Sequence, residues 1–140
     1  MPTSLNTSAA ASITAVEGMG YNVVCKPVTL TVSANPTGGT SVGLVKIPAN
    51  AVIVDMLVVA SDLDTSGTPT LTFSIGTDAS PTYFINLSTI GQTGGLVRPT
   101  AVTARPLTFA APDTINITWG TAAATFAAGT IDLVVQYINP

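Results

Sequence analysis

Four segments of the chain alternate apolar and polar residues with a period of two. Their apolar series are Val28, Leu30 and Val32; Leu71, Phe73 and Ile75; Ile115, Ile117 and Trp119; and Ile131, Leu133, Val135 and Tyr137. Successive side chains of a strand point to opposite faces, so such alternation places one face on a core and the other on solvent. Turn-forming pairs such as Ser66-Gly67 and Gly94-Gly95 separate the segments. Short strands with almost no helical pattern predict an all-β fold, an antiparallel β-sandwich or a jelly-roll-like fold.

Residues 51–60, AVIVDMLVVA, depart from this alternation. Both faces of this predicted strand are apolar except at Asp55. In an antiparallel fold, a strand of this kind is either fully internal or covered on its outer face by another subunit. The sequence leaves both interpretations open.

The low-complexity start of the chain predicts an N-terminal arm. Residues 1–18 are rich in Ser, Thr and Ala, nearly uncharged and weakly periodic, whereas residues 19–140 carry the strand pattern of a single β-sandwich domain. We expect the arm to lie on a neighbouring chain, with Leu5, Ile13 and Val16 as its contact candidates.

Three aromatic residues of the domain are further contact candidates. Tyr83 and Phe84 are adjacent, so both cannot face inward on one strand. Phe126 stands in the Ala-rich loop of residues 121–130. We therefore expect these side chains to contact another protein or a sugar.

Charge is scarce throughout the chain. Charged residues make up 8% of the sequence, against about 25% in ordinary soluble proteins. Since soluble monomers normally rely on charge to stay dispersed, this scarcity predicts that other protein covers much of the surface, as in a homo-oligomer. The four Lys and Arg residues are scattered, which argues against nucleic acid as a partner.

The N-terminal pattern and the lack of a long apolar run favour a cytoplasmic site of synthesis. The lone cysteine, Cys25, stands in a predicted strand at residues 21–26, where we interpret it as a small buried apolar residue rather than a reactive thiol. The start lacks a charged region followed by a long apolar run, so it does not resemble a signal peptide. No stretch approaches the roughly 18 apolar residues that would span a membrane, and no membrane partner is expected.

The absence of histidine removes several catalytic mechanisms. Residues 39–43, GTSVG, match a nucleophile elbow, but that motif needs a base for its Ser and a strand–turn–helix setting. Residues 44–47 instead have the pattern of a strand, so we interpret the motif as a turn. We predict no catalytic residues, no cofactor and no enzymatic activity.

The stretch SDLDTSGTP, residues 61–69, matches the opening of a calcium-binding loop through Asp62, Asp64, Ser66 and Gly67. The EF-hand is excluded because position twelve is Phe73 rather than Glu and the flanks have strand patterns. A looser calcium site at Asp62 and Asp64 is the alternative. Our main interpretation is a hairpin turn between residues 51–60 and 70–75, whose aspartates accept hydrogen bonds from backbone N–H groups.

Three stretches of the chain resemble a group of small tailed-phage proteins. They are KIPANAVIVDMLVVASDLDTSGTPTLTFSIGTDASPTYFI, GQTGG and AAATFAAGTIDLVVQY, which occur in this order within residues 45–138. The resemblance implies a virion structural protein of the head decoration, or cement, type, with a β-sandwich or jelly-roll fold. It further implies the major capsid protein as partner, a homotrimeric state and a place on the capsid surface.

Two other functions remain open from the sequence. One is a head fibre, neck or tail component of the same virion. The other is a carbohydrate-binding adhesion module, in which Tyr83 or Phe126 would stack on sugar rings.

Overall fold

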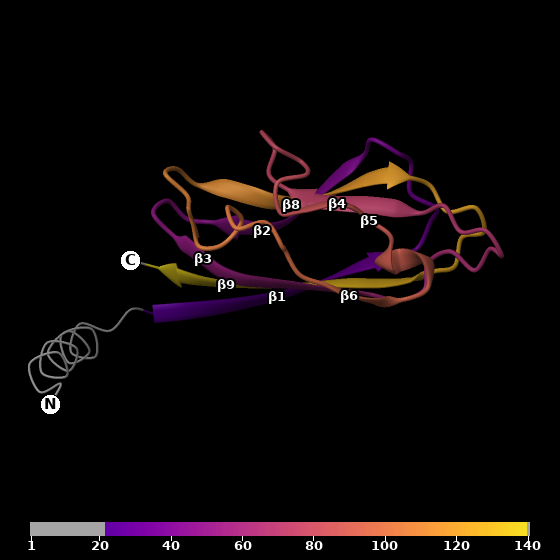
Figure 1. Cartoon of the computed structure of the whole chain (residues 1–140), viewed down its shortest axis with the longest axis horizontal. Coiled ribbons are helices and arrows are strands. Elements are labelled where there is room, and N and C mark those ends of the chain that lie inside the picture. Colours follow the sequence, from indigo (N-terminus) through magenta and orange to yellow (C-terminus); the bar gives the residue numbers. More distant parts are fainter. Residues whose placement is uncertain (1–21, 140) are drawn as a thin grey trace, which may run out of the picture.

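The computed structural model describes residues 22–139, which form two antiparallel sheets packed face to face (Figure 1). The first, sheet A, has the order β1 (Asn22–Val32), β9 (Gly129–Asn139), β3 (Val52–Ala60) and β6 (Gly95–Val97), with β7 (Leu107–Thr108) also paired to β3. The second, sheet B, has the order β2 (Ser41–Ile47), β8 (Asp113–Thr121), β4 (Thr72–Gly76) and β5 (Ile85–Ser88). A short 3-10 helix, η1 (Ile90–Gln92), leads from β5 to β6. The predicted antiparallel β-sandwich is confirmed.

The core lies between the inner faces of the two sheets and contains residues that the period-two alternation predicted to be buried. The predicted apolar series of β4, β8 and β9 are all buried. In their midst, Phe73 and Trp119 pack edge to face with ring centroids 6.0 Å apart. Val28 and Leu30 are only partly buried because β1 is an edge strand of sheet A.

Strand β3 lies inside sheet A, between β9 and the short strands β6 and β7. Its inner side chains, including Met56 and Val58, are buried. On its outer face Val54 and Val59 are 42% and 37% exposed. The interpretation of a strand internal on both faces is therefore wrong for the single chain, in which no described element covers the outer face.

The predicted hairpin between residues 51–60 and 70–75 is also wrong. Strand β3 belongs to sheet A and β4 to sheet B, so residues 61–71 cross from one sheet to the other. A turn at Ser66-Gly67 reverses the chain direction both in a hairpin and in a crossing between sheets, so the turn residues do not distinguish the two. The crossing is adopted because β3 pairs with β9, more than seventy residues later in the sequence.

Two smaller expectations need correction. Cys25 is exposed rather than buried, because the register of β1 on β9 directs Val24 and Val28 towards the core and Cys25 to the outer face. Residues 41–43 of the GTSVG motif lie in strand β2 rather than in a turn.

The first and last described strands lie side by side, with Asn22 paired to Asn139 (Figure 1). The described chain therefore begins at the end of the sandwich where β9 finishes. The predicted arm and its contact candidates Leu5, Ile13 and Val16 lie outside the described residues. Within residues 22–139, no helix has the length and apolarity to cross a membrane.

Candidate functional site

The acidic stretch places Asp64 in the connection from β3 to β4, with its side chain buried. Asp64 is 1% exposed. Its carboxylate accepts hydrogen bonds from five backbone N–H groups: Thr70 (2.7 Å), Leu71 (3.1 Å), Ser66 (3.4 Å), Ala124 (2.9 Å) and Thr125 (2.9 Å). Three of these donors belong to the β3–β4 connection and two to the β8–β9 connection. One carboxylate thus ties together two segments that cross between the sheets.

Backbone pairing reinforces this junction. Thr65 N–H donates to the Thr125 carbonyl at 2.9 Å, and Ala127 N–H donates to the Leu63 carbonyl at 3.0 Å. The side chain of Phe126, between these residues, packs against the core. Backbone hydrogen bonds therefore join residues 125–127 of the Ala-rich loop to residues 63–65 of the β3–β4 connection.

The hydrogen bonds to Asp64 also set its ionisation. Burial acts to raise the pKa of the carboxyl group, but the backbone donors Thr125, Thr70, Ala124 and Leu71 outweigh it and hold the pKa of Asp64 well below its ordinary value of 3.8. The side chain is therefore a buried anion whose counter-charge comes from oriented N–H dipoles.

Asp62 completes the local turn. It is exposed, and its Oδ1 accepts a hydrogen bond from Asp64 N–H at 3.1 Å. The prediction that these aspartates accept backbone N–H groups is confirmed. A calcium ion needs six to eight oxygen ligands, whereas N–H groups already occupy the oxygens of Asp64, so the geometry favours the structural role over the calcium alternative.

The outer face of sheet A is an uncovered surface on which most of the side chains are apolar. It comprises Val23, Cys25, Pro27, Thr29, Val52, Val54, Asp55, Leu57, Val59, Leu96, Asp132, Val134, Gln136 and Ile138. Leu96 and Val23 are 65% and 64% exposed. A sheet that is apolar on both faces exposes a surface suited to contact with another protein.

The outer face of sheet B is polar by comparison. Its strands present Ser41, Thr72, Ser74, Thr114, Asn116 and Thr118. Ser41 and Thr118 hydrogen-bond to each other at 2.7 Å across β2 and β8. Leu87 on β5 is the exposed large apolar side chain of this sheet's outer side, at 53%. The two outer faces therefore differ in chemistry, and the apolar outer face of sheet A is the candidate for contact with another protein.

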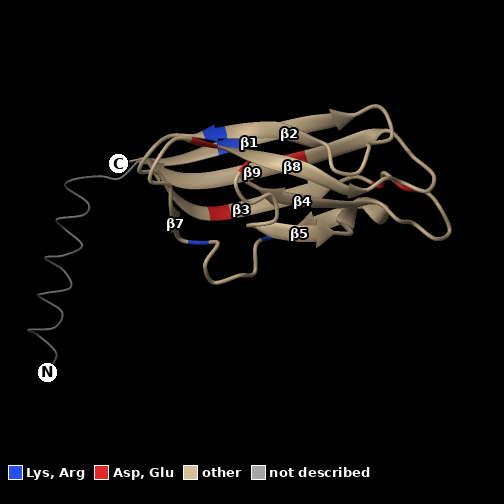
Figure 2. Ribbon diagram, turned by 90° about the horizontal axis from the view of Figure 1, so that it is seen from above, with Lys and Arg blue, Asp and Glu red and all other residues tan. Residues whose placement is uncertain are grey.

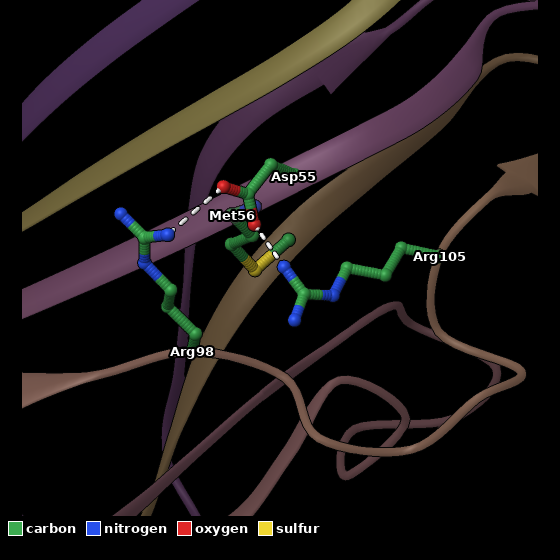
Figure 3. Close-up of polar contacts among 4 residues, drawn as sticks. All are labelled: Asp55, Met56, Arg98 and Arg105. Atoms are coloured by element: carbon green, nitrogen blue, oxygen red, sulfur yellow. Dashed lines mark hydrogen bonds and ion pairs between the residues drawn. The ribbon is translucent and has the colours of Figure 1, made fainter.

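Charged groups are few, and half of the chain's four cations meet on one edge of sheet A (Figure 2). Arg98 Nη1 lies 3.4 Å from Asp55 Oδ2, and Arg105 Nη1 pairs with Asp55 Oδ1 (Figure 3). Both arginines belong to the segment between β6 and β7, which runs along the edge of β3. Asp55 stands beside a bulge in β3 that turns its carboxylate towards them.

This cluster has an unbalanced charge. Two guanidinium groups share one carboxylate, which leaves one positive charge in excess. The side chain of Arg98 is 52% exposed, against 26% for Asp55. Exposed ion pairs contribute about 0–1 kcal/mol to stability, so the main consequence is a cationic point next to an apolar face.

The structure separates the aromatic contact candidates. Phe84 is 4% exposed and belongs to the core, so its ring is not available on the surface of the single chain. Tyr83 is partly buried, packs edge to face on Phe84 and donates its hydroxyl to the Thr103 carbonyl at 3.0 Å. Phe126 is partly buried in the other loop, so the three rings form no common patch.

Comparisons with known proteins show in which structures similar chains occur. No protein-family model and no curated protein sequence matches the chain. Solved capsid structures do match. A chain of the cyanophage Pam1 capsid asymmetric unit is 25% identical with a TM-score of 0.75, over 88% of this chain and 89% of that one.

Two further capsid structures extend the likeness. A chain of the capsid of Ralstonia phage GP4 is 30% identical with a TM-score of 0.75, over 85% of both chains. A chain of the acidic stable capsid structure of Helicobacter pylori bacteriophage KHP30 is 17% identical with a TM-score of 0.59, over 86% of this chain and 94% of that one, and shares the fold alone. The resemblance to phage virion proteins is confirmed, and the chain belongs to a family of structural proteins of the bacteriophage head.

Proposed function

We propose that this protein is a capsid decoration, or cement, protein that binds the shell of major capsid protein and stabilises it without enzymatic activity. The likeness to solved phage capsid chains is the observation that carries the proposal. Low charge and an exposed apolar face are typical of a protein that functions within an assembly, where other protein covers its surface. Solved capsid chains that match it over at least 85% of its length support the same role.

The β-sandwich is the rigid part of the proposed decoration protein. Asp64 fixes both crossing connections at one end, and the core fills the space between the sheets. Rigid bodies lose little conformational entropy on binding, which leaves more of the contact energy for the interface. A specific interface buries about 800 Å² on each partner.

Shell contact is assigned to the N-terminal arm of residues 1–18, with Leu5, Ile13 and Val16 as anchors. Tyr83 and Phe126, which are partly buried in the single chain, are the loop candidates. These contacts across junctions between capsomers resist the outward pressure of the packaged genome. The protein is made in the host cytoplasm and joins the outer surface of the head as a homotrimer.

The strand order supports a jelly-roll assignment. Sheet A runs β1-β9-β3-β6 and sheet B runs β2-β8-β4-β5, so most connections cross between the sheets. Jelly rolls of this kind are common in viral capsids.

Binding to purified shells tests the proposal. Full-length protein and a variant lacking residues 2–18 are each mixed with shells that lack the protein, and the shells are pelleted. We expect the full-length protein to pellet with the shells and to raise their disruption temperature, and the truncated protein to stay in the supernatant. Failure of the full-length protein to bind contradicts the decoration role, and full binding by the truncated protein contradicts the role of the arm.

A further inference from the structure

We infer that the outer face of sheet A binds a second copy of this chain, with Arg98 of one copy facing Asp132 of the other. The inference concerns which partner covers this face, and it does not depend on binding to the shell. Its basis is the position of two charged groups, the Arg98 cluster and Asp132, on either side of an apolar area.

Strand register fixes the positions of the two charges. Asp132 on β9 is level with Val59 on β3. Val58 is paired with Val97 on β6, so Arg98, the next residue, is level with Leu57. Arg98 and Asp132 therefore lie at opposite corners of an area of the outer face whose centre holds Leu57 and Val59.

Each corner lacks a full counter-charge. On the cationic side, Arg98 shares Asp55 with Arg105, so the cluster keeps one positive charge (Figure 3). On the anionic side, Asp132 Oδ1 accepts a hydrogen bond from Thr29 Oγ1. Neither ion pair found within residues 22–139 includes Asp132. The face thus presents one excess positive charge at the corner of Arg98 and, at the corner of Asp132, a carboxylate with no ion pair within residues 22–139.

The centre of this area is apolar. Leu57 and Val134 are partly buried, whereas Val59 and Leu96 are 37% and 65% exposed. Contact between two such faces would remove these side chains from water and would partly desolvate the charge pairs at the corners. Apolar centres with complementary charges around them are the usual anatomy of stable protein interfaces.

A second copy meets both requirements at once. A foreign partner would need a carboxylate and a cation at matching separations, whereas another copy of the chain carries both. In a two-fold dimer each Arg98 faces the Asp132 of the other copy, so the contact occurs twice. In a three-fold ring the contact occurs once in each interface, with Arg98 towards one neighbouring copy and Asp132 towards the other. The face is self-complementary in charge as well as in apolar character.

The mass of the purified full-length protein over a micromolar range, measured by sedimentation equilibrium, tests the inference. We expect wild type to be an oligomer and Leu96→Glu to be a monomer. Leu87→Glu is the matched control, since Leu87 is a similarly exposed leucine on the opposite sheet, and it should leave the mass unchanged. Far-ultraviolet circular dichroism establishes that each variant is folded.

Charge reversal tests the pairing itself. Arg98→Glu and Asp132→Arg should each weaken association by at least about 10-fold, and the double variant should return to within about threefold of wild type. The inference is overturned by a monomeric wild type, by equal effects of the two leucine variants, or by a double variant no better than the singles.

The two proposals fail separately. Monomeric wild type that binds shells, with binding lost in Leu96→Glu, would make the capsid the partner of this face and overturn only the inference. An oligomer formed through this face that does not bind shells would overturn only the decoration role.

Discussion

The carboxylate of Asp64 accepts a hydrogen bond at 2.9 Å from the backbone N–H of Thr125, 61 residues away in the sequence. This contact joins the β3–β4 connection to the β8–β9 connection, both of which cross between the sheets. A buried carboxylate with several backbone donors costs little as long as every donor is satisfied, and much once the acceptor is removed. The junction is therefore the most sensitive polar feature of the described fold.

Replacing Asp64 by Asn should destabilise the protein markedly. The amide would present an NH₂ group to backbone donors and leave some of them unpaired in a buried place. We expect the midpoint of thermal unfolding to fall by roughly 10 °C or more. Asp62→Asn, an exposed neighbour with one backbone donor, is the control and should change the midpoint by roughly 2 °C or less. Equal effects of the two substitutions would contradict the role assigned to Asp64.

Stability should fall in acid because of the same residue. The pKa of Asp64 is depressed in the folded protein, so the unfolded chain takes up a proton first as the pH drops. The stabilisation is fully present well above pH 3.8, the ordinary value, and is lost progressively below it. Urea unfolding of wild type between pH 7 and pH 3 should show this decline. Asp64→Asn should lack this part of the acid dependence, and an equally steep decline in that variant would assign it to other groups.

Calcium should have no effect on the fold. The N–H groups around Asp64 supply the positive potential that a cation would supply in a calcium loop. We expect the unfolding midpoint and the molecular mass to be the same in 5 mM EDTA as in 5 mM calcium (roughly saturating for a weak site). A calcium-dependent rise in the midpoint that disappears in Asp62→Asn would restore the metal site.

Cys25 can report directly on coverage of the outer face of sheet A. The thiol is exposed on this face in the single chain. If a second copy covers the face, a maleimide reagent should label the wild-type oligomer at least about fivefold more slowly than the monomeric Leu96→Glu variant. Equal labelling rates in the oligomer and the monomer would place the subunit contact elsewhere.

Period-two alternation predicted the inner faces of β4, β8 and β9 because burial of alternate positions is a local property of a strand. Phe73, Ile117 and Leu133 were assigned to the core on this basis, and all three are 0% exposed. The role of the acidic residues as acceptors for backbone N–H groups was likewise readable from the turn chemistry around them.

Sheet membership was not readable in the same way. Whether residues 61–71 form a hairpin or a crossing depends on the pairing of β3 with β9, and no local pattern encodes that choice. The convergence of Arg98 and Arg105 on Asp55 has the same origin, because only the pairing of β6 and β7 along β3 brings them together. Asp55 did stand out in the sequence as the one polar interruption of an apolar strand. Cys25 was misassigned because its immediate neighbours do not reveal which face of β1 it occupies.

The most direct test of the decoration role is electron microscopy of phage particles that carry a label on this protein. We predict that the label is distributed over the outer surface of the head. Label confined to the neck, the tail or a fibre would contradict the account and assign the same sandwich to another part of the virion.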